Sequence, residues 1–247
     1  MHEYPSKYVD AKFAVFERTP ISKPSRSGCW YHLKSPVGGI SFDVHILSSL
    51  IMTPNDLTGF NSTGNIRIWP SEEYLAYYLL QNQAIVRDKS VLELGAGMVG
   101  LSGLTSARLG AHEVVLTDGN EKSVKNAQLI VDENLLGDRV SCCVLSWTCT
   151  LPRNDQFDLI LCADCLFFTE EHRNLLDCTY QHLKPCGSAY FLAPDRAGTA
   201  KIFLDCLYGE RRRWNSVSVN FHVQDEAKLM SENDIHVDDQ ILIILRK

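Results

Sequence analysis

The chain of 247 residues carries 24 Lys and Arg against 30 Asp and Glu, a formal net charge of −6, and 45% of its residues are hydrophobic. These values are typical of a globular protein, and they exclude a disulfide-stapled mini-protein, a disordered chain and a protein that holds nucleic acid through its net charge. No run approaches the ~18 apolar residues of a membrane span, and the start of the chain lacks the apolar segment of a signal peptide. We therefore expect an intracellular protein, in the cytoplasm and also in the nucleus, that binds no membrane, and we expect it to be a monomer.

Nine cysteines, an odd number, suit free thiols in a reducing compartment, because several of them lie inside apolar runs. Cys162 and Cys165 form a C-x-x-C pair, but no second pair of Cys or His residues completes a set of four zinc ligands. The sequence therefore predicts no structural disulfide and no metal site.

Residues 1–65 differ from the rest of the chain because prolines and glycines break them into short runs. Within them, residues 29–33 and 40–47 have the composition of two short strands that pair as a hairpin across residues 36–39. We expect a small β-rich N-terminal appendage over residues 1–65, followed by one larger domain over residues 66–247.

The larger domain begins with a helix at Trp69-Pro70-Ser71-Glu72-Glu73. Proline is tolerated in the first turn, Ser71 can cap it, and the two glutamates complement the positive end of the helix dipole. From residue 90 onward, strand and helix patterns alternate. Strands are predicted at 90–94, 113–116, 140–145, 157–163, 188–193, 216–223 and 241–245, with helices at 98–109, 120–137, 175–183 and 199–208 between them. This order predicts an α/β fold with a doubly wound, mostly parallel sheet whose last strand is antiparallel.

A glycine-rich turn at residues 95–100, Gly-Ala-Gly-Met-Val-Gly, follows the first of these strands, with Asp118 eighteen residues further on. This G-x-G-x-x-G pattern is shared by nucleotide-binding folds, in which an acid at the end of the second strand accepts both ribose hydroxyls. Glu93, two residues before the first glycine, would repel a pyrophosphate but would attract a cofactor that carries an ammonium and a sulfonium. The pattern therefore favours S-adenosylmethionine over a dinucleotide.

Four stretches of the sequence carry a resemblance to a known family: GFNSTGNIRIWPSEEYLAYY, VLELGAGMVGLSG, LTDGNEKSVKNAQ and CADCLFF. The last of them contains Asp164 and Phe167 in a D-x-x-F/Y pattern. Together they resemble the class I seven-strand protein lysine methyltransferases, and within that group the calmodulin-lysine N-methyltransferases. The resemblance implies a Rossmann-like class I methyltransferase fold, S-adenosylmethionine as cofactor and a lysine of calmodulin as substrate.

The resemblance also assigns roles to individual residues. It places the methionine end of the cofactor against Glu93, Gly95 and Gly97. It places the ribose against Asp118 and the adenine near Trp147. Trp69 and Asp164 are also implied to contact the cofactor. Two positions depart from the family pattern, because Val99 replaces a third glycine and Thr148 stands where an acid follows Trp147.

Asp164 and Phe167 are the predicted catalytic residues. Methyl transfer from a sulfonium requires a neutral amine in line with the methyl group and a dry site, and it needs no metal. Asp164 can orient the amine or the cofactor's ammonium by a charged hydrogen bond, and Phe167 can line the path of the lysine side chain. The alternative is structural: Asp164 caps the following helix and Phe167 belongs to the core.

Three further functions stay open at this point: an NAD(P)-binding oxidoreductase, a lysine methyltransferase of a protein other than calmodulin, and a catalytically silent adaptor. We expect no nucleic-acid substrate, because base-directed N-methyltransferases carry D/N-P-P-Y/F where Cys165 and Leu166 replace the two prolines. For a protein partner, the candidate contact surfaces are the less acidic residues 1–65 and the basic run Arg211, Arg212 and Arg213.

Overall fold

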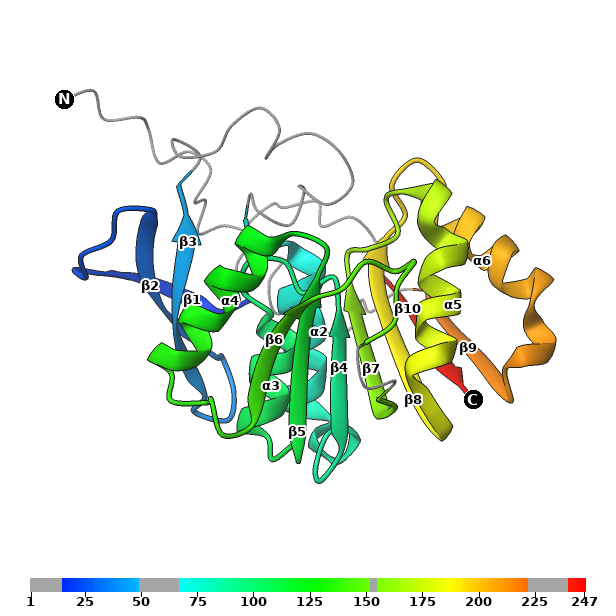
Figure 1. Cartoon of the computed structure of the whole chain (residues 1–247), viewed down its shortest axis with the longest axis horizontal. Helices are drawn as coiled ribbons and strands as arrows, with labels where there is room; N and C mark the ends of the chain where they lie inside the picture. Colours follow the sequence, from blue (N-terminus) through cyan, green and yellow to red (C-terminus); the bar gives the residue numbers. More distant parts are fainter. Residues whose placement is uncertain (1–14, 49–66, 152–154, 222–239) are drawn as a thin grey trace.

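A seven-stranded sheet runs through the larger part of the chain in this computed structural model, which describes residues 15–48, 67–151, 155–221 and 240–247 (Figure 1). Its strands lie in the order β6-β5-β4-β7-β8-β10-β9. Their bounds are β4 (Ser90–Leu94), β5 (Glu113–Asp118), β6 (Val140–Val144), β7 (Phe157–Ala163), β8 (Leu183–Pro194), β9 (Ser216–Phe221) and β10 (Gln240–Arg246). The pairs among β4 to β8 are parallel, whereas β10 is antiparallel to both of its neighbours. The predicted doubly wound sheet with an antiparallel last strand is confirmed.

Helices cover both faces of this sheet. On one face lie α2 (Pro70–Gln81), α3 (Leu101–Arg108) and α4 (Glu121–Glu133), and on the other α5 (His172–His182) and α6 (Thr199–Gly209). Three short 3-10 turns complete the described helical segments: η4 (Gln83–Ile85), η5 (Thr169–Glu171) and η6 (Arg211–Arg213). Successive residues of β4 enter different cores, Val91 that of α2 to α4 and Leu92 that of α5 and α6. Because both faces are covered, the central strands β4 and β7 are buried along nearly their whole length instead of alternating between buried and exposed residues.

The start of α2 differs from the prediction. Trp69 is the N-cap and Pro70 occupies the first turn, but no side chain caps the helix. Ser71, the predicted cap, instead donates its hydroxyl to Gln240 Oε1 over 2.7 Å. The cap prediction is wrong because this serine, fully buried beside β10, has a long-range partner that the local sequence does not reveal.

A second, three-stranded antiparallel sheet precedes α2. Its strands are β1 (Glu17–Ile21), β2 (Gly28–Lys34) and β3 (Ser41–Leu47), and the β2–β3 hairpin confirms the predicted pairing. Its inward side chains Leu33, Phe42 and Val44 are fully buried in the same core as α2, α3 and α4. Figure 1 shows this small sheet, in blue, beside α4. The sheet therefore shares a core with the larger part of the chain; the predicted boundary at residue 65 lies outside the described residues.

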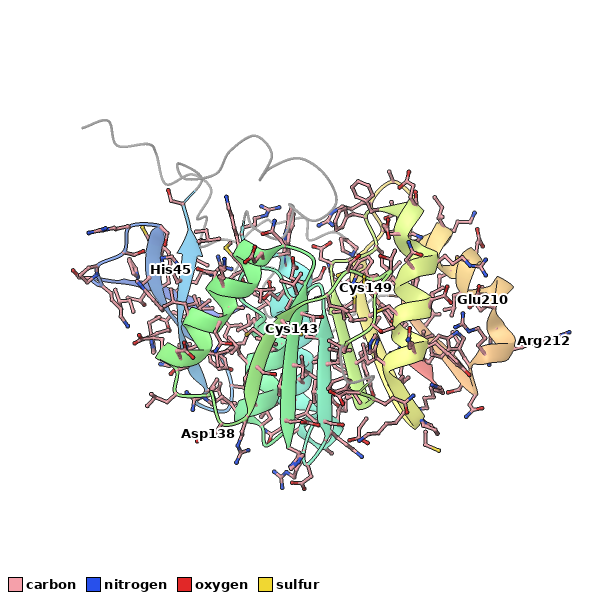
Figure 2. All side chains as sticks on the ribbon, in the orientation of Figure 1. His45, Asp138, Cys143, Cys149, Glu210 and Arg212 are labelled. Carbon is pink, nitrogen blue, oxygen red and sulfur yellow. The ribbon has the colours of Figure 1, made fainter. Side chains whose placement is uncertain are left out.

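Buried polar contacts fix this small sheet on α4. His45 Nδ1 lies 2.6 Å from Asn126 Oδ1, and His45 Nε2 lies 2.7 Å from Ser25 Oγ. The Asn126 amide nitrogen in turn donates to the carbonyl oxygens of His45 and Met98, both at 2.8 Å. Figure 2 marks His45 on β3, next to α4. Asn126 thus joins the small sheet to the glycine-rich turn, to which Met98 belongs.

All nine cysteines lie in the described residues, and each is a free thiol. Cys162, Cys165 and Cys178 are buried, whereas Cys29, Cys149 and Cys186 are exposed. Burial raises the pKa of the Cys178 thiol to about 12, whereas the hydrogen bond with Cys162 and then burial raise the pKa of the Cys165 thiol well above its usual range. Among the described helices, none is long and apolar enough to cross a membrane.

Candidate active site

A pocket opens where the carboxyl ends of β4, β5 and β7 meet. The chain order of the sheet reverses between β4 and β7, since β5 and β6 lie on one side and β7 and β8 on the other. Open α/β sheets bind ligands at such a switch point. The pocket lining includes every residue predicted as a site residue: Trp69, Glu93, Gly95, Gly97, Asp118, Trp147, Asp164 and Phe167. The structure therefore brings the whole predicted constellation together, while the individual roles stay predictions.

The glycine-rich turn forms the pocket wall after β4. Gly95, Gly97 and Gly100 all have left-handed φ values, 67°, 61° and 69°, which favour glycine. A Cβ atom at Gly95 would also lie 2.6 Å from Cys165 Sγ, so that a larger residue would collide with the segment after β7. The α3 helix begins at Leu101, three residues later than predicted, because the turn uses these left-handed positions before helical geometry starts.

Asp118, at the end of β5, holds the turn in place. Its Oδ2 accepts the N–H of Gly97 at 3.0 Å, and its Oδ1 accepts the N–H of Asn120 at 2.8 Å. Burial raises the pKa of this carboxyl to about 6. A carboxylate offers about four lone-pair sites, so two bonds leave acceptor capacity toward the pocket. That capacity fits two ribose hydroxyls.

Two buried glutamates lie at the other end of the glycine-rich turn. Glu93 Oε2 accepts the N–H of Gly103 at 2.7 Å, and Glu72 Oε1 accepts the N–H of Leu101 at 2.8 Å, so both carboxyls hold the first turn of α3. Burial, the largest effect, raises the pKa of Glu72 to about 7; burial and then the neighbouring Glu72 raise that of Glu93 well above its usual range. Glu72 also lines the pocket, a role that the sequence did not indicate.

Asp164, directly after β7, has its side chain fixed by an arginine. Both of its carboxyl oxygens pair with the guanidinium of Arg196, one of them over 2.9 Å. The guanidinium also lies 5.2 Å from the ring centre of Trp69, and Arg67 lies 4.2 Å from the same ring. The capping alternative for Asp164 is not observed, because η5 has no side-chain cap. The sequence analysis missed Arg196, which follows the end of β8.

The two remaining aromatic residues line the pocket as predicted. Phe167 is half-buried instead of lying in the core, and its ring packs edge-on against Phe168 at 5.6 Å. Trp147 is 8% exposed, with Cζ2 3.6 Å from where a Cβ of Gly95 would lie. The pocket thus offers a flat indole beside the glycine-rich turn and a phenyl ring near Asp164.

The carboxyl groups that line the pocket fit a nucleoside that carries positive charge. Carboxyl groups are present at both ends of the glycine-rich turn, Glu72 and Glu93 at one and Asp118 at the other. A pyrophosphate would meet these anionic groups at close range, whereas a cationic group would replace part of their lost hydration. In the described part of the chain no cluster of three His, Cys, Asp or Glu side chains could hold a metal ion.

The basic run at residues 211–213 is mostly committed to internal contacts. Arg213 pairs with Asp177 and Glu210, and its guanidinium lies 4.4 Å from the ring centre of Tyr180. Arg211 donates to the carbonyl oxygen of Trp214 at 2.5 Å. Only Arg212 of the three is exposed, and Figure 2 shows it pointing away from the protein. This run therefore offers a partner less free charge than the sequence suggests.

Comparison with solved structures identifies the fold. The chain resembles the Thermus thermophilus 16S rRNA N2 G1207 methyltransferase RsmC, solved in complex with AdoMet and guanosine, with a TM-score of 0.59 and 17% identity over 94% of this chain and 58% of that one. It also resembles the Bacillus cereus O-methyltransferase in complex with SAH, with a TM-score of 0.53 and 18% identity over 81% and 94%. These likenesses show the class I methyltransferase fold.

The family follows from the sequence comparisons. Residues 52–209 match the lysine methyltransferase family, and the chain belongs to this family. It is 34% identical to the calmodulin-lysine N-methyltransferase of Arabidopsis thaliana over 152 residues, 58% of this chain and 50% of that protein. It is 31% identical to the protein N-lysine methyltransferase METTL21A of Danio rerio over 178 residues, 69% and 74% of the two chains. The matches span about half the length of the first of the curated relatives.

Proposed function

We propose that the protein transfers methyl groups from S-adenosylmethionine to a lysine side chain of a protein substrate, and that this substrate is calmodulin. The observation that carries the proposal is the pocket at the β4–β7 switch point, where a nucleoside-binding wall meets the Asp164–Phe167 segment in a chain of the lysine methyltransferase family. S-adenosylmethionine is the cofactor that the family and the fold indicate.

Different residues of the pocket suit different parts of the cofactor. Asp118 has free acceptor sites for the ribose hydroxyls, the indole of Trp147 offers a surface for the adenine, and the carboxyls beside α3 suit the cationic methionine end. Bound there, the cofactor supplies a methyl group on a positively charged sulfur. Glu93 opposes a pyrophosphate at the same place, which disfavours the alternative of an NAD(P)-binding oxidoreductase.

The protein's part in the reaction is to hold a neutral amine in line with the methyl group and to exclude water. A lysine that enters the pocket loses its proton more readily because burial and a nearby positive charge both lower its pKa. Arg196 takes one edge of the Asp164 carboxyl and leaves the remaining lone pairs to accept an N–H of the amine. Phe167 lines the path of the apolar lysine stem.

Two considerations support calmodulin as the substrate. The matched region is 34% identical to a calmodulin-lysine N-methyltransferase, although the names of other relatives give protein lysine methylation without naming calmodulin. Arg67 and Arg196, both next to Trp69, also place positive charge beside the pocket of an otherwise acidic protein, where it can meet an acidic substrate locally. Long-range attraction is absent because both proteins carry net negative charge.

Mass spectrometry of calmodulin after incubation with the protein and S-adenosylmethionine tests this proposal. We expect calmodulin to gain methyl groups on lysine, and we expect Phe167→Ala to slow methylation at least ~10-fold while the cofactor Kd changes little, because the ring lines the lysine path. Unmodified calmodulin, together with label from the cofactor on another protein of a cell lysate, would assign the chain to a different substrate. Unfolding of Phe167→Ala, measured by circular dichroism, would instead show a structural role for the ring.

A further inference from the structure

Glu72 and Glu93 are two buried carboxyl groups that form no ion pair with any cation among the residues that the structure describes. Their residues are 7% and 1% exposed, and both side chains line the pocket. Neither forms an ion pair within the described residues, whereas a buried carboxylate without a partner is strongly disfavoured. Glu72 accepts the backbone N–H groups of Leu101 and Trp69, and Glu93 accepts the N–H of Gly103 and the hydroxyl of Ser102, which compensates only part of a full negative charge.

The described ionic groups nearest the pair have other partners, and the pocket-lining cation Arg67 lies against the ring of Trp69 instead of pairing with either glutamate. Arg18 of β1, which is close enough to influence Glu72, pairs with the adjacent Glu73. Asp164, on the β7 side, is neutralised by Arg196. On the remaining sides the pair meets the hydroxyl of Ser102 and the thiol of Cys142, neither of which is a cation. The carboxyls therefore hold protons more readily than exposed glutamates, and when they ionise their negative charge faces the pocket and no paired cation among the described side chains.

We infer that Glu72 acts with Glu93 as a charge-sensing pair that binds the positively charged sulfonium end of the cofactor more tightly than the neutral thioether end of the product. This inference rests on the proposed function. Methyl transfer moves the methyl group to the amine nitrogen and leaves its electron pair on sulfur, so that the cofactor loses one positive charge. The same carboxyls that favour the charged cofactor then lose their counterion, which favours release of the product. Glu93 was expected at this end of the cofactor, and Glu72 is the new member of the site.

Isothermal titration of two ligands to the purified full-length protein tests the inference without any turnover. S-adenosylmethionine and S-adenosylhomocysteine share the adenosine, the carboxylate and the ammonium, and they differ at the sulfur. We expect Glu72→Gln to weaken S-adenosylmethionine binding ~10-fold and S-adenosylhomocysteine binding no more than ~2-fold, because glutamine keeps the size and the acceptor oxygen but loses the charge. Equal weakening of both ligands would overturn the inference.

Two control variants separate this effect from a general loss of the site. Asp118→Asn changes a carboxyl at the ribose end and is expected to weaken both ligands by the same factor. Asp158→Asn changes a carboxyl near the start of β7 that pairs with Lys184 and does not line the pocket, so the ratio of the two affinities should stay at its wild-type value. If either control changed the ratio of the S-adenosylmethionine and S-adenosylhomocysteine affinities as much as Glu72→Gln does, a specific role of the pair would be contradicted.

A measurement on the unaltered protein keeps the inference testable if Glu72→Gln does not fold. Titrations at pH 7 in two buffers with different heats of ionisation report the protons exchanged on binding. Because a cation favours the ionised carboxyls, S-adenosylmethionine should release more protons than S-adenosylhomocysteine; the amino group common to both ligands cancels in the difference. Equal proton release would overturn the inference, whereas failure of both ligands to bind would overturn the proposed function itself.

Discussion

The two ends of the molecule are both held by polar side chains, but the contacts differ in kind. At the N-terminal end, His45, Asn126 and Glu73 are almost fully buried, and each joins the small sheet to a helix of the large domain. At the opposite end, Arg213 and Arg173 form ion pairs with Asp177 and Glu210 in contact with solvent. Figure 1 shows these ends on either side of the pocket-bearing strands.

This difference determines which end can influence the pocket. A buried polar group must find its partners, because leaving it unpaired costs about 1–3 kcal/mol, so such contacts fix position. Exposed ion pairs contribute about 0–1 kcal/mol and tolerate loss. The N-terminal contacts also reach the glycine-rich turn through Met98, whereas the ion pairs at the far end reach no pocket residue among those described. We therefore expect substitutions at the two ends to differ in both size and consequence.

The largest effect is expected for Asn126→Leu, which conserves volume but removes the contacts to His45 and Met98. It removes the partner of His45 Nδ1 and the amide that donates to the carbonyl oxygens of His45 and Met98, so we expect the free energy of unfolding to fall by about 3 kcal/mol. Urea denaturation measures this change. The cofactor Kd should rise as well, because the carbonyl of Met98 is no longer held. A loss below ~0.5 kcal/mol would contradict the assignment of these contacts.

An intermediate effect is expected for Arg18→Met, which removes the cation that pairs with Glu73. Glu73 would keep the two backbone donors Val15 and Phe16 but would lose its counterion at a buried position. We expect a loss of about 2 kcal/mol in thermal or urea unfolding, discounted because Arg18 is partly exposed. Arg18→Lys serves as the matched control and should recover part of the loss. If both variants were as stable as the wild type, the buried pair would not help to attach β1.

The smallest effect is expected for Arg213→Ala at the opposite end. The variant loses two ion pairs in a partly exposed network, so we expect a change of about 0.5 kcal/mol that disappears in 1 M salt. Arg212→Ala, which removes the exposed neighbour, should leave stability unchanged and slow calmodulin methylation less than ~10-fold. Stability losses comparable to that of Asn126→Leu would show that the two ends are held with similar strength.

Most of the large sheet was predictable, because a long alternation of strands and helices is compatible with only a few sheet topologies. The small sheet was predictable only in part. The β2–β3 hairpin has a proline- and glycine-containing turn, but β1 contains Pro20, which argues against a strand by local preference. Its position at the edge of the sheet tolerates a proline, and that position is a property of the tertiary structure.

The site shows the same division between local and long-range information. The residues predicted from motifs line the pocket because they lie at or shortly after the carboxyl ends of strands at the switch point or, in the case of Trp69, directly before a helix. Arg196 could not be predicted from a motif, because it lies 32 residues from Asp164 in the sequence. Only its position just after β8, at the carboxyl end of a strand, indicates that it belongs to the site. Glu72 was interpreted as a complement to the helix dipole, since no local pattern shows that its side chain crosses to the start of α3.

The distribution of the thiols gives the protein a ready set of labelling sites. Exposed Cys29 lies on the small sheet, Cys149 in the loop that follows the pocket residue Trp147, and Cys186 on the far part of β8. Figure 2 marks Cys149 between the strands and α5. Maleimide dyes should attach to these three thiols, while the buried thiols are shielded and, as at Cys178, hard to ionise. Fluorophores at Cys29 and Cys149 would report the spacing between the small sheet and the pocket in solution.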